Sequence, residues 1–355
     1  MTLQQGAESQ LLPAIPLEIQ FLILDQLYTG SLSRRRRIAN LSPLALTCFA
    51  WAGHIQPLLF RNISLNKCNT DAFLSLLRRN GRLGEYVLAI FLPGGARVIL
   101  NPDLVRHLPN VHTIRVTSHS YMSLVEPHRP WVTVRTLSLS FCILSTAQDL
   151  WAFIDLFPAL ESLECGGWMY ARGDMRRQLA ARQFTVDSFS VSLATEEDRD
   201  ASPCNALLSR IGPTLQVLDV TELPEELAPS ESAFIPLDIS NCTALRHLTL
   251  RLHHSTASPT HMNTGLISFL HQIPSGPLTT LTLETILAAP LLELQWDVDG
   301  ILSAYTFRDL ENIAIRVRPA SSTTSLTFGE VKTHLESRMA GLRQLGLLQV
   351  EHVEL

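Results

Sequence analysis

The hexapeptide LRHLTL, residues 245–250, carries apolar residues at its first, fourth and sixth positions. The alternation at its end is typical of a short strand that buries one face. Comparable hexapeptides begin at residues 60, 83, 111, 134, 160, 186, 215, 278, 310 and 342. Because leucine, isoleucine, valine and phenylalanine together make up roughly one-third of the chain, with 62 leucines among the 355 residues, about ten such hexapeptides would arise by chance. Their spacing therefore carries more information than their number.

The hexapeptides recur at a slowly drifting interval. Successive starts lie 23, 28, 23, 26, 26, 29, 30, 33, 32 and 32 residues apart. Several follow segments with a helical spacing of apolar residues, such as DAFLSLLRRN (71–80) and AQDLWAFIDLFPA (147–159). A helix–turn–strand unit cannot bury its apolar face alone, so neighbouring units must stack. The sequence predicts an elongated α/β solenoid (horseshoe) with a parallel sheet from about Asn62 onward, and a separate α/β domain with a parallel sheet is the alternative.

Strand alternation also predicts which side chains face the concave side of such a solenoid. The last two apolar residues of each hexapeptide point inward, so the residues between and just after them point outward. Taken singly, each is expected to be an ordinary solvated strand residue. As a set they form the candidate substrate-facing surface: Arg115, Thr117, Ser138, Ser140, Asp219, Thr221, Thr249, Arg251, Thr282, Glu284, Arg316 and Arg318.

The front of the chain differs, because its apolar residues follow helical spacing. In IPLEIQFLILDQL (15–27), Pro16 and Glu18 suit a first helical turn, and the apolar stripe runs from Ile19 to Leu27. The segment SLSRRRR (31–37) is expected to be a solvated loop, since four arginines are too few for a persuasive nuclear-import signal. LSPLALTCFAWAGHIQPLLF (41–60) supplies a second apolar helical run.

Together these two runs resemble an F-box. That motif begins with Leu/Ile-Pro-x-Glu and an apolar helix, continues through a linker, and ends with a second helix that carries a cysteine and a tryptophan. The remainder of the chain resembles the irregular leucine-rich repeats found behind F-boxes, although the consensus asparagine is met in the first unit, at Asn69, and generally fails afterwards. The resemblance divides the chain into a disordered N-terminus (1–11), an F-box-like helical domain (12–60) and a leucine-rich-repeat-like domain (61–355).

The resemblance implies a non-catalytic substrate receptor of an SCF-type cullin–RING ubiquitin ligase. Its F-box would bind the Skp-family adaptor, and its repeats would present a protein substrate whose identity the sequence does not give. The residues matched to the adaptor-binding motif are Pro16, Glu18, Ile19, Ile23, Leu27, Leu44, Cys48 and Trp51. The alternative is an interaction scaffold whose F-box-like helices only cap the solenoid. A hydrolase or transferase built on a parallel sheet is the weakest hypothesis.

Composition argues against several other classes of protein. The formal net charge of −5 is not that of a nucleic-acid-binding chain, and no apolar run is long enough to span a membrane. We expect no signal peptide, because the first ten residues lack a basic segment followed by an apolar one. We therefore expect a cytoplasmic and/or nuclear protein with no nucleic-acid or membrane partner. The six cysteines lack metal-site spacing, so all should be reduced, with Cys142, Cys165 and Cys242 buried. No metal, cofactor or catalytic residue is expected, and the histidines of residues 253–261 lack partners for a metal site.

Overall fold

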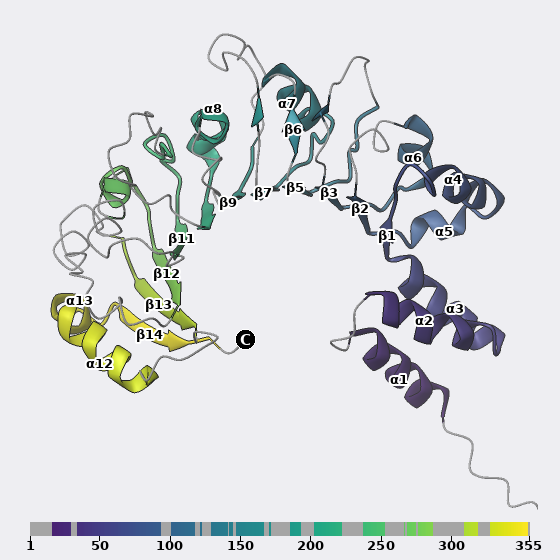
Figure 1. The fold of residues 1–355 in the computed structure, drawn as a ribbon, viewed down its shortest axis with the longest axis horizontal. Coiled ribbons are helices and arrows are strands. Elements are labelled where there is room, and N and C mark those ends of the chain that lie inside the picture. The colour runs from purple at the N-terminus through teal and green to yellow at the C-terminus, as the bar shows by residue number, and fades with distance from the viewer. Residues whose placement is uncertain are drawn as a thin grey trace, which may run out of the picture.

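The computed structural model describes residues 16–29, 34–93, 101–117, 121–122, 129–140, 142–144, 147–166, 170–171, 185–192, 202–221, 237–252, 266, 268–274, 276–286, 309–318 and 327–353. It is an α/β structure in which an open, eleven-stranded parallel sheet follows the inner edge of an arc (Figure 1). Helices lie along the outer edge, and three further helices stand at the β1 end of the arc. The expected α/β class and parallel sheet are confirmed.

The sheet takes its strands in chain order, with short strands skipped. Its members are β1 (Asn62–Ser64), β2 (Ala89–Pro93), β3 (Thr113–Thr117), β5 (Thr136–Ser140), β7 (Ser162–Gly166), β9 (Ser188–Ser192), β10 (Val217–Thr221), β11 (His247–Leu252), β12 (Thr280–Ile286), β13 (Asn312–Arg318) and β14 (Leu348–His352). A second sheet joins β4 (Tyr121–Met122), β6 (Ile143–Leu144) and β8 (Tyr170–Ala171). Sequential parallel pairing of this kind requires each connection to return the chain to the same end of the sheet, which gives the stack its solenoid-like form.

Burial follows the hexapeptide pattern through most of the stack. Leu218, Leu248, Leu281 and Ile313 are neighbours in register on β10 to β13, and each is at most 1% exposed. They belong to one continuous hydrophobic cluster that runs from β1 to the last helices. Each unit therefore buries its apolar side against the next, as stacking requires.

Two hexapeptides are displaced from the predicted register. The buried residues of β2 are Ile90 and Leu92, so the unit expected at Leu83 begins four residues later, and Leu83 itself lies in a helix. At the other end Ile313 pairs with Leu348, so the last unit begins three residues after Leu342. Both segments are so rich in apolar residues that more than one register satisfies the pattern, and a short helix before each strand takes up the difference.

The helices of the outer edge include α4 (Thr70–Arg79), α5 (Arg82–Glu85), α6 (Pro102–His107), α7 (Ala147–Ile154), α8 (Ser202–Ile211), α12 (Phe328–Arg338) and α13 (Ala340–Gln344). A 3₁₀ turn, Gly212–Thr214, follows α8. Asn69 joins the first strand to the first of these helices: its side chain accepts from the Asn66 N–H at 2.8 Å and donates to the Ser64 carbonyl at 3.0 Å.

The front of the chain forms three helices where two were expected. These are α1 (Leu17–Thr29), α2 (Arg34–Ala45) and α3 (Phe49–Phe60), and the arginines expected in a loop form the first turn of α2. Arginine is a good helix former, so a run of four does not by itself favour a loop. The second apolar run breaks into two helices at residues 46–48, where the Thr47 hydroxyl donates to the Leu44 carbonyl at 2.7 Å.

The cysteines lie as predicted. All six are free thiols. Cys142, Cys165 and Cys242 are 0%, 3% and 1% exposed, and Cys204 is buried as well. Burial raises the pKa of Cys165 and raises that of Cys242 to about 12, so these thiols stay protonated and behave as small apolar residues of the stack.

Candidate interaction surfaces

The three N-terminal helices have a small core of their own. Leu24, Leu41 and Ile55 are at most 2% exposed and form a hydrophobic cluster separate from that of the solenoid. The opposite side of α1 leaves apolar side chains in solvent: Ile19 is 46%, Leu22 59% and Ile23 49% exposed. Three large apolar residues on one exposed helix face are unusual for a surface that stays solvated, and such patches often mark interfaces.

Polar contacts hold α1 in place on α3. The Trp51 indole Nε1 donates to the Gln20 Oε1 at 2.6 Å, and the His54 Nε2 lies 2.9 Å from the Asp25 Oδ1. The His54 ring also stacks on Phe21, with centroids 4.2 Å apart. These contacts fix the orientation of α1 on α3. The exposed apolar side chains of α1 therefore keep defined positions on the surface of the unit.

The residues matched to the adaptor-binding motif divide into two groups. Pro16, Glu18, Ile19, Ile23 and Cys48 are exposed, whereas Leu27, Leu44 and Trp51 pack half-buried against the small core. The motif match missed two exposed apolar residues at the break between α2 and α3: Leu46 is 88% and Phe49 is 98% exposed. The apolar run from 41 to 60 shows no gap at this break, so sequence reasoning had no signal for either residue.

The twelve predicted concave residues share one face of the main sheet, as the register requires. Arg115 pairs with Ser138, and Asp219 pairs with Thr249, which pairs with Thr282. A second row contains Thr117, Ser140, Thr221, Arg251, Glu284 and Arg316, with Arg318 two residues further along β13. The expectation that each is solvated is wrong for Thr282 and Glu284, which are 6% and 7% exposed.

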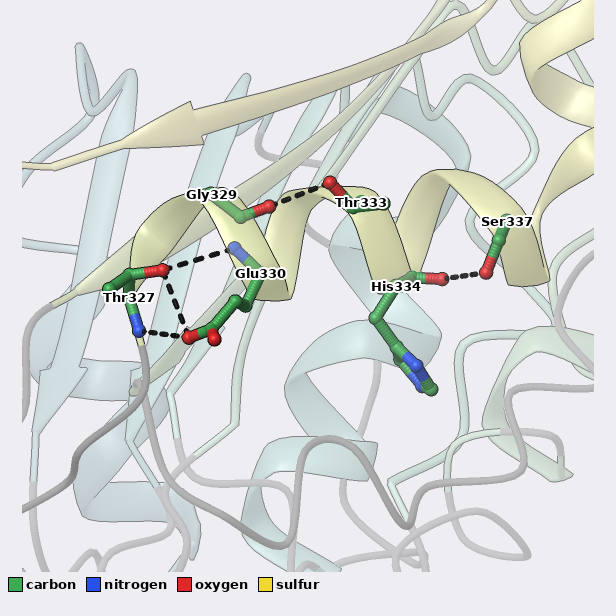
Figure 2. Close-up of a pocket in the computed structure, with 6 residues that line it drawn as sticks. All are labelled: Thr327, Gly329, Glu330, Thr333, His334 and Ser337. Carbon is green, nitrogen blue, oxygen red and sulfur yellow. Dashed lines mark hydrogen bonds between the residues drawn. The ribbon is translucent and has the colours of Figure 1, made fainter.

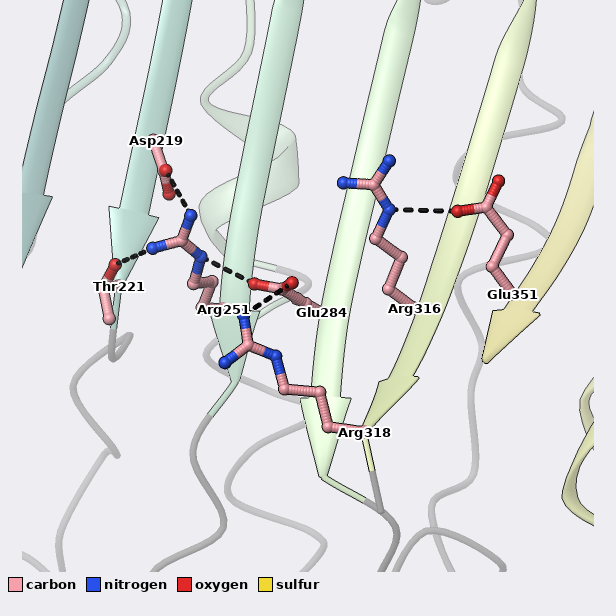
Figure 3. A network of polar contacts seen from close by, with 7 residues as sticks. All are labelled: Asp219, Thr221, Arg251, Glu284, Arg316, Arg318 and Glu351. Carbon is pink, nitrogen blue, oxygen red and sulfur yellow. Dashed lines mark hydrogen bonds and ion pairs between the residues drawn. The ribbon is translucent and has the colours of Figure 1, made fainter. Parts of the chain in front are cut away.

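Glu284 is the centre of a charged network on β10 to β13 (Figure 3). Its Oε2 lies 2.6 Å from the Arg251 Nε, and its Oε1 accepts from the Arg318 NH2 at 2.9 Å. Arg251 also reaches Asp219, where the NH2–Oδ2 distance is 2.9 Å, and donates to the Thr221 hydroxyl at 3.4 Å. Two arginines and two carboxylates therefore neutralise one another across the four strands.

A further ion pair extends this pattern to the last strand. The Arg316 Nε donates to the Glu351 Oε2 at 3.0 Å, and both side chains are partly exposed. Sequence reasoning missed Glu351, because the last hexapeptide was placed three residues early and the residue fell outside it. It also missed Glu164, which alternation places on the concave row between Ser138 and Ser190.

Burial raises the pKa of Asp219 above its ordinary value of 3.8. The Arg251 guanidinium opposes this rise, whereas the negative charges of Glu284 and Glu164 add to it. The raised pKa of Asp219 thus has one main cause: the carboxylate has lost much of its hydration, and the single neighbouring guanidinium of Arg251 does not fully compensate for this loss.

A depression of about 720 Å³ lies along α12 (Figure 2). Four of its five polar side chains bond within their own helix, whereas the His334 ring points away from the helix and its buried Nε2 has no hydrogen-bond partner among the described residues. Thr327 and Glu330 form a reciprocal cap, the Thr333 hydroxyl donates to the Gly329 carbonyl, and the Ser337 hydroxyl donates to the His334 carbonyl. Because these groups are directed at the helix backbone, the depression has the character of a helix surface.

Within the described residues, no group of three histidine, cysteine or acidic side chains is placed to hold a metal ion. The histidines at positions 253, 254 and 261 lie outside the described part of the chain. None of the described helices combines the length and hydropathy needed to cross a membrane. A scan against models of protein families and a search of curated proteins give no significant match to this chain.

Proposed function

We propose that this chain is a substrate receptor of an SCF-type ubiquitin ligase. In this role α1–α3 dock on the Skp-family adaptor, and the concave face of the solenoid holds a protein substrate while other subunits transfer ubiquitin. The observation that carries the proposal is the exposed apolar face of α1 on a unit that already has its own core. The proposal assigns no chemical step to the chain.

The arrangement of the unit supports docking. Helix α3 packs against β1 and α5, and Phe60 contributes to the solenoid core. Helix α1 meets the solenoid at its far end, where the Asn62 Nδ2 donates to the Tyr28 hydroxyl at 3.1 Å. The exposed apolar residues lie in the earlier part of α1, from Leu17 to Ile23. The residues that attach the unit to the solenoid are therefore different from those of the exposed apolar face, so the face stays accessible to a partner.

The scaffold alternative has its own support, because α3 does cover the β1 end of the stack. A terminal unit of a solenoid needs a cap against water, and α3 with Phe60 supplies apolar cover there. Capping accounts for α3 but leaves the apolar face of α1 without a role. Under this alternative no partner protein binds α1, so a charged substitution on its exposed face would not weaken any complex.

The test of the proposal is assembly from purified components. The full-length chain, a Skp-family adaptor and the matching cullin are mixed and passed over a column that holds the tagged cullin. We expect the cullin to retain the chain only when the adaptor is present. Retention without the adaptor, or no retention with it, would contradict the receptor proposal and favour the scaffold.

A further inference from the structure

The concave face of the sheet has two parts that differ in how their charges are satisfied. The braced segment, which we define as Asp219, Arg251, Glu284, Arg316, Arg318 and Glu351, pairs its three arginines with its three carboxylates. Side chains that are already paired with one another attract a charged ligand only weakly. The braced segment is therefore better suited to holding β10 to β14 together than to binding a ligand.

The open segment lies on β2 to β9, and the described residues show no such pairing in it. We define it as Phe91, Arg115, Ser138, Glu164 and Ser190, which are successive neighbours in register along one row. Arg115 is exposed, Glu164 is half-buried, and neither makes an ion pair with any residue of the described chain. Phe91 stands beside Arg115 and is 40% exposed.

The floor beside this row carries short side chains. Thr117, Ser140, Gly166 and Ser192 follow one another in register on β3 to β9. A Cβ at Gly166 would lie 3.4 Å from the Ser140 Oγ. Short side chains and a glycine let another backbone approach the sheet closely, and hydroxyls can hydrogen-bond to it.

We propose that the open segment binds an extended peptide segment of the substrate, in which an apolar residue and a carboxylate lie one or two residues apart and a basic residue follows. The apolar residue packs on Phe91, the carboxylate pairs with Arg115, and the basic residue pairs with Glu164. This inference rests on the proposed function, and it names the chemistry of the substrate segment.

The strand spacing sets the spacing of the peptide. Neighbouring strands lie about 4.8 Å apart, and an extended chain advances about 3.3 Å per residue. Phe91 and Arg115 are one strand apart, whereas Arg115 and Glu164 are two strands apart, about 10 Å. The carboxylate therefore lies one or two residues from the apolar residue, and the basic residue about three residues beyond the carboxylate.

The charges favour a carboxylate over a phosphate. A phosphorylated residue carries nearly two negative charges and is generally held by a cluster of arginines. The open segment offers the single arginine Arg115, and Glu164 stands two strands away with the opposite charge. A singly charged carboxylate matches this surface, and a doubly charged phosphate would be repelled by Glu164.

The experiment is selection from a phage-displayed library of random dodecapeptides on the full-length chain. We expect selected peptides to share the apolar, acidic and basic residues at the stated spacing. A synthetic copy of the selected peptide should bind the Arg115→Glu variant about tenfold more weakly in fluorescence anisotropy, because an attraction becomes a repulsion. A copy with the acidic residue changed to lysine should regain binding to that variant.

The matched control is Arg106→Glu, an exposed arginine of α6 on the outer edge of the arc, which should bind the selected peptide as the wild type does. Failure of the selection, equal binding to the wild type and to Arg115→Glu, or loss of binding on Arg106→Glu would overturn the proposal. A stronger response to a phosphoserine copy than to the carboxylate copy would overturn the assignment of the ligand. Retention on the adaptor–cullin column is measured separately. If the peptide selection fails but the column retains the chain, the proposed function stands. If the column fails to retain the chain, the peptide selection still reports on the open segment.

Discussion

Glu284 joins three strands of the sheet through two arginines, at a side chain only 8% exposed. The variant Glu284→Gln keeps the shape but leaves Arg251 and Arg318 without their shared anion. We expect the free energy of unfolding to fall by about 2 kcal/mol, as for loss of a hydrogen bond to a charged, poorly hydrated group. Urea denaturation of the full-length chain measures this change.

The control for this variant is Glu161→Gln. Glu161 accepts from Arg135 at 2.7 Å, but both side chains are more than half exposed. Exposed pairs contribute about 0–1 kcal/mol, so this variant should stay close to the wild type. Equal losses from the two substitutions would show that the network at Glu284 adds nothing beyond an ordinary surface pair.

Asp219 gives the network a dependence on pH. Its pKa is raised above 3.8 in the folded chain, so the folded state binds the proton more tightly than the unfolded state does. Its contribution to stability is therefore greatest below its unfolded pKa and is lost as the pH rises through the folded pKa. Relative to Asp219→Asn, the wild type should lose free energy of unfolding as the pH rises from about 4 through the folded pKa of Asp219.

Glu330 supplies a control of opposite sign. Hydrogen bonds from the Thr327 backbone and side chain lower the pKa of Glu330 below its ordinary value of 4.5. Its contribution is present above the unfolded pKa and is lost as the pH falls through the folded one. Relative to Glu330→Gln, the wild type should therefore gain stability as the pH rises from below the folded pKa of Glu330 to its unfolded value of about 4.5. If both comparisons moved in the same direction, the interpretation of Asp219 would be wrong.

At the residue scale, the sequence predicts on which side of the sheet a side chain lies better than it predicts which other side chains it contacts. Alternation placed Arg251, Glu284 and Arg316 on the concave side, because side chains in a strand must alternate. It did not predict that Glu284 bridges two arginines, since those residues are more than 30 positions apart. Such pairs depend on which strands become neighbours and in what register, and these follow only from the stack as a whole.

At the scale of the elements, α12 offers a clear test of local sequence. Thr327 caps the helix by accepting from the Glu330 N–H at 3.3 Å, and its own N–H donates to the Glu330 carboxylate at 2.8 Å. The variant Thr327→Ala removes the side-chain cap, which typically costs about 1 kcal/mol. A lower melting temperature and faster amide exchange in the first turn of α12 should follow.

The comparison for this cap is Thr333→Ala in the interior of the same helix. Thr333 is exposed and its hydroxyl donates only to the Gly329 carbonyl. Alanine is the better helix former, so this variant should be as stable as the wild type or slightly more so. A loss as large as that of Thr327→Ala would mean that the cap has no special role.

The elements were predictable where one register satisfied the apolar pattern, and less so elsewhere. The strands at 134–139 and 160–165 pair in parallel as expected. The hexapeptides at 83 and 342 were misplaced, because apolar residues continue beyond them into β2 and β14. The third helix at the front was missed for a related reason: the apolar run from 41 to 60 shows no gap, and the chain breaks at residues 46–48 through local hydrogen bonds.

At the scale of the whole molecule, two hydrophobic cores are joined in one chain. The solenoid cluster and the cluster around Leu24, Leu41 and Ile55 are separate, and α3 connects them. The sequence predicted this division from a change of period, from 3.6 residues at the front to alternation in the strands. The role of each part is a proposal that binding measurements must test.

The receptor proposal requires the exposed face of α1 to bind a Skp-family adaptor, so the dissociation constant of that complex tests it. We expect the full-length chain to bind with a Kd of about 1 µM or tighter, and Ile19→Asp to weaken binding by about thirtyfold or more. Leu76→Asp on α4 is the matched control, since Leu76 is 39% exposed and Ile19 46%. It should bind as the wild type does. An intact, cooperatively melting chain that binds no adaptor, or equal effects of the two substitutions, would contradict the account.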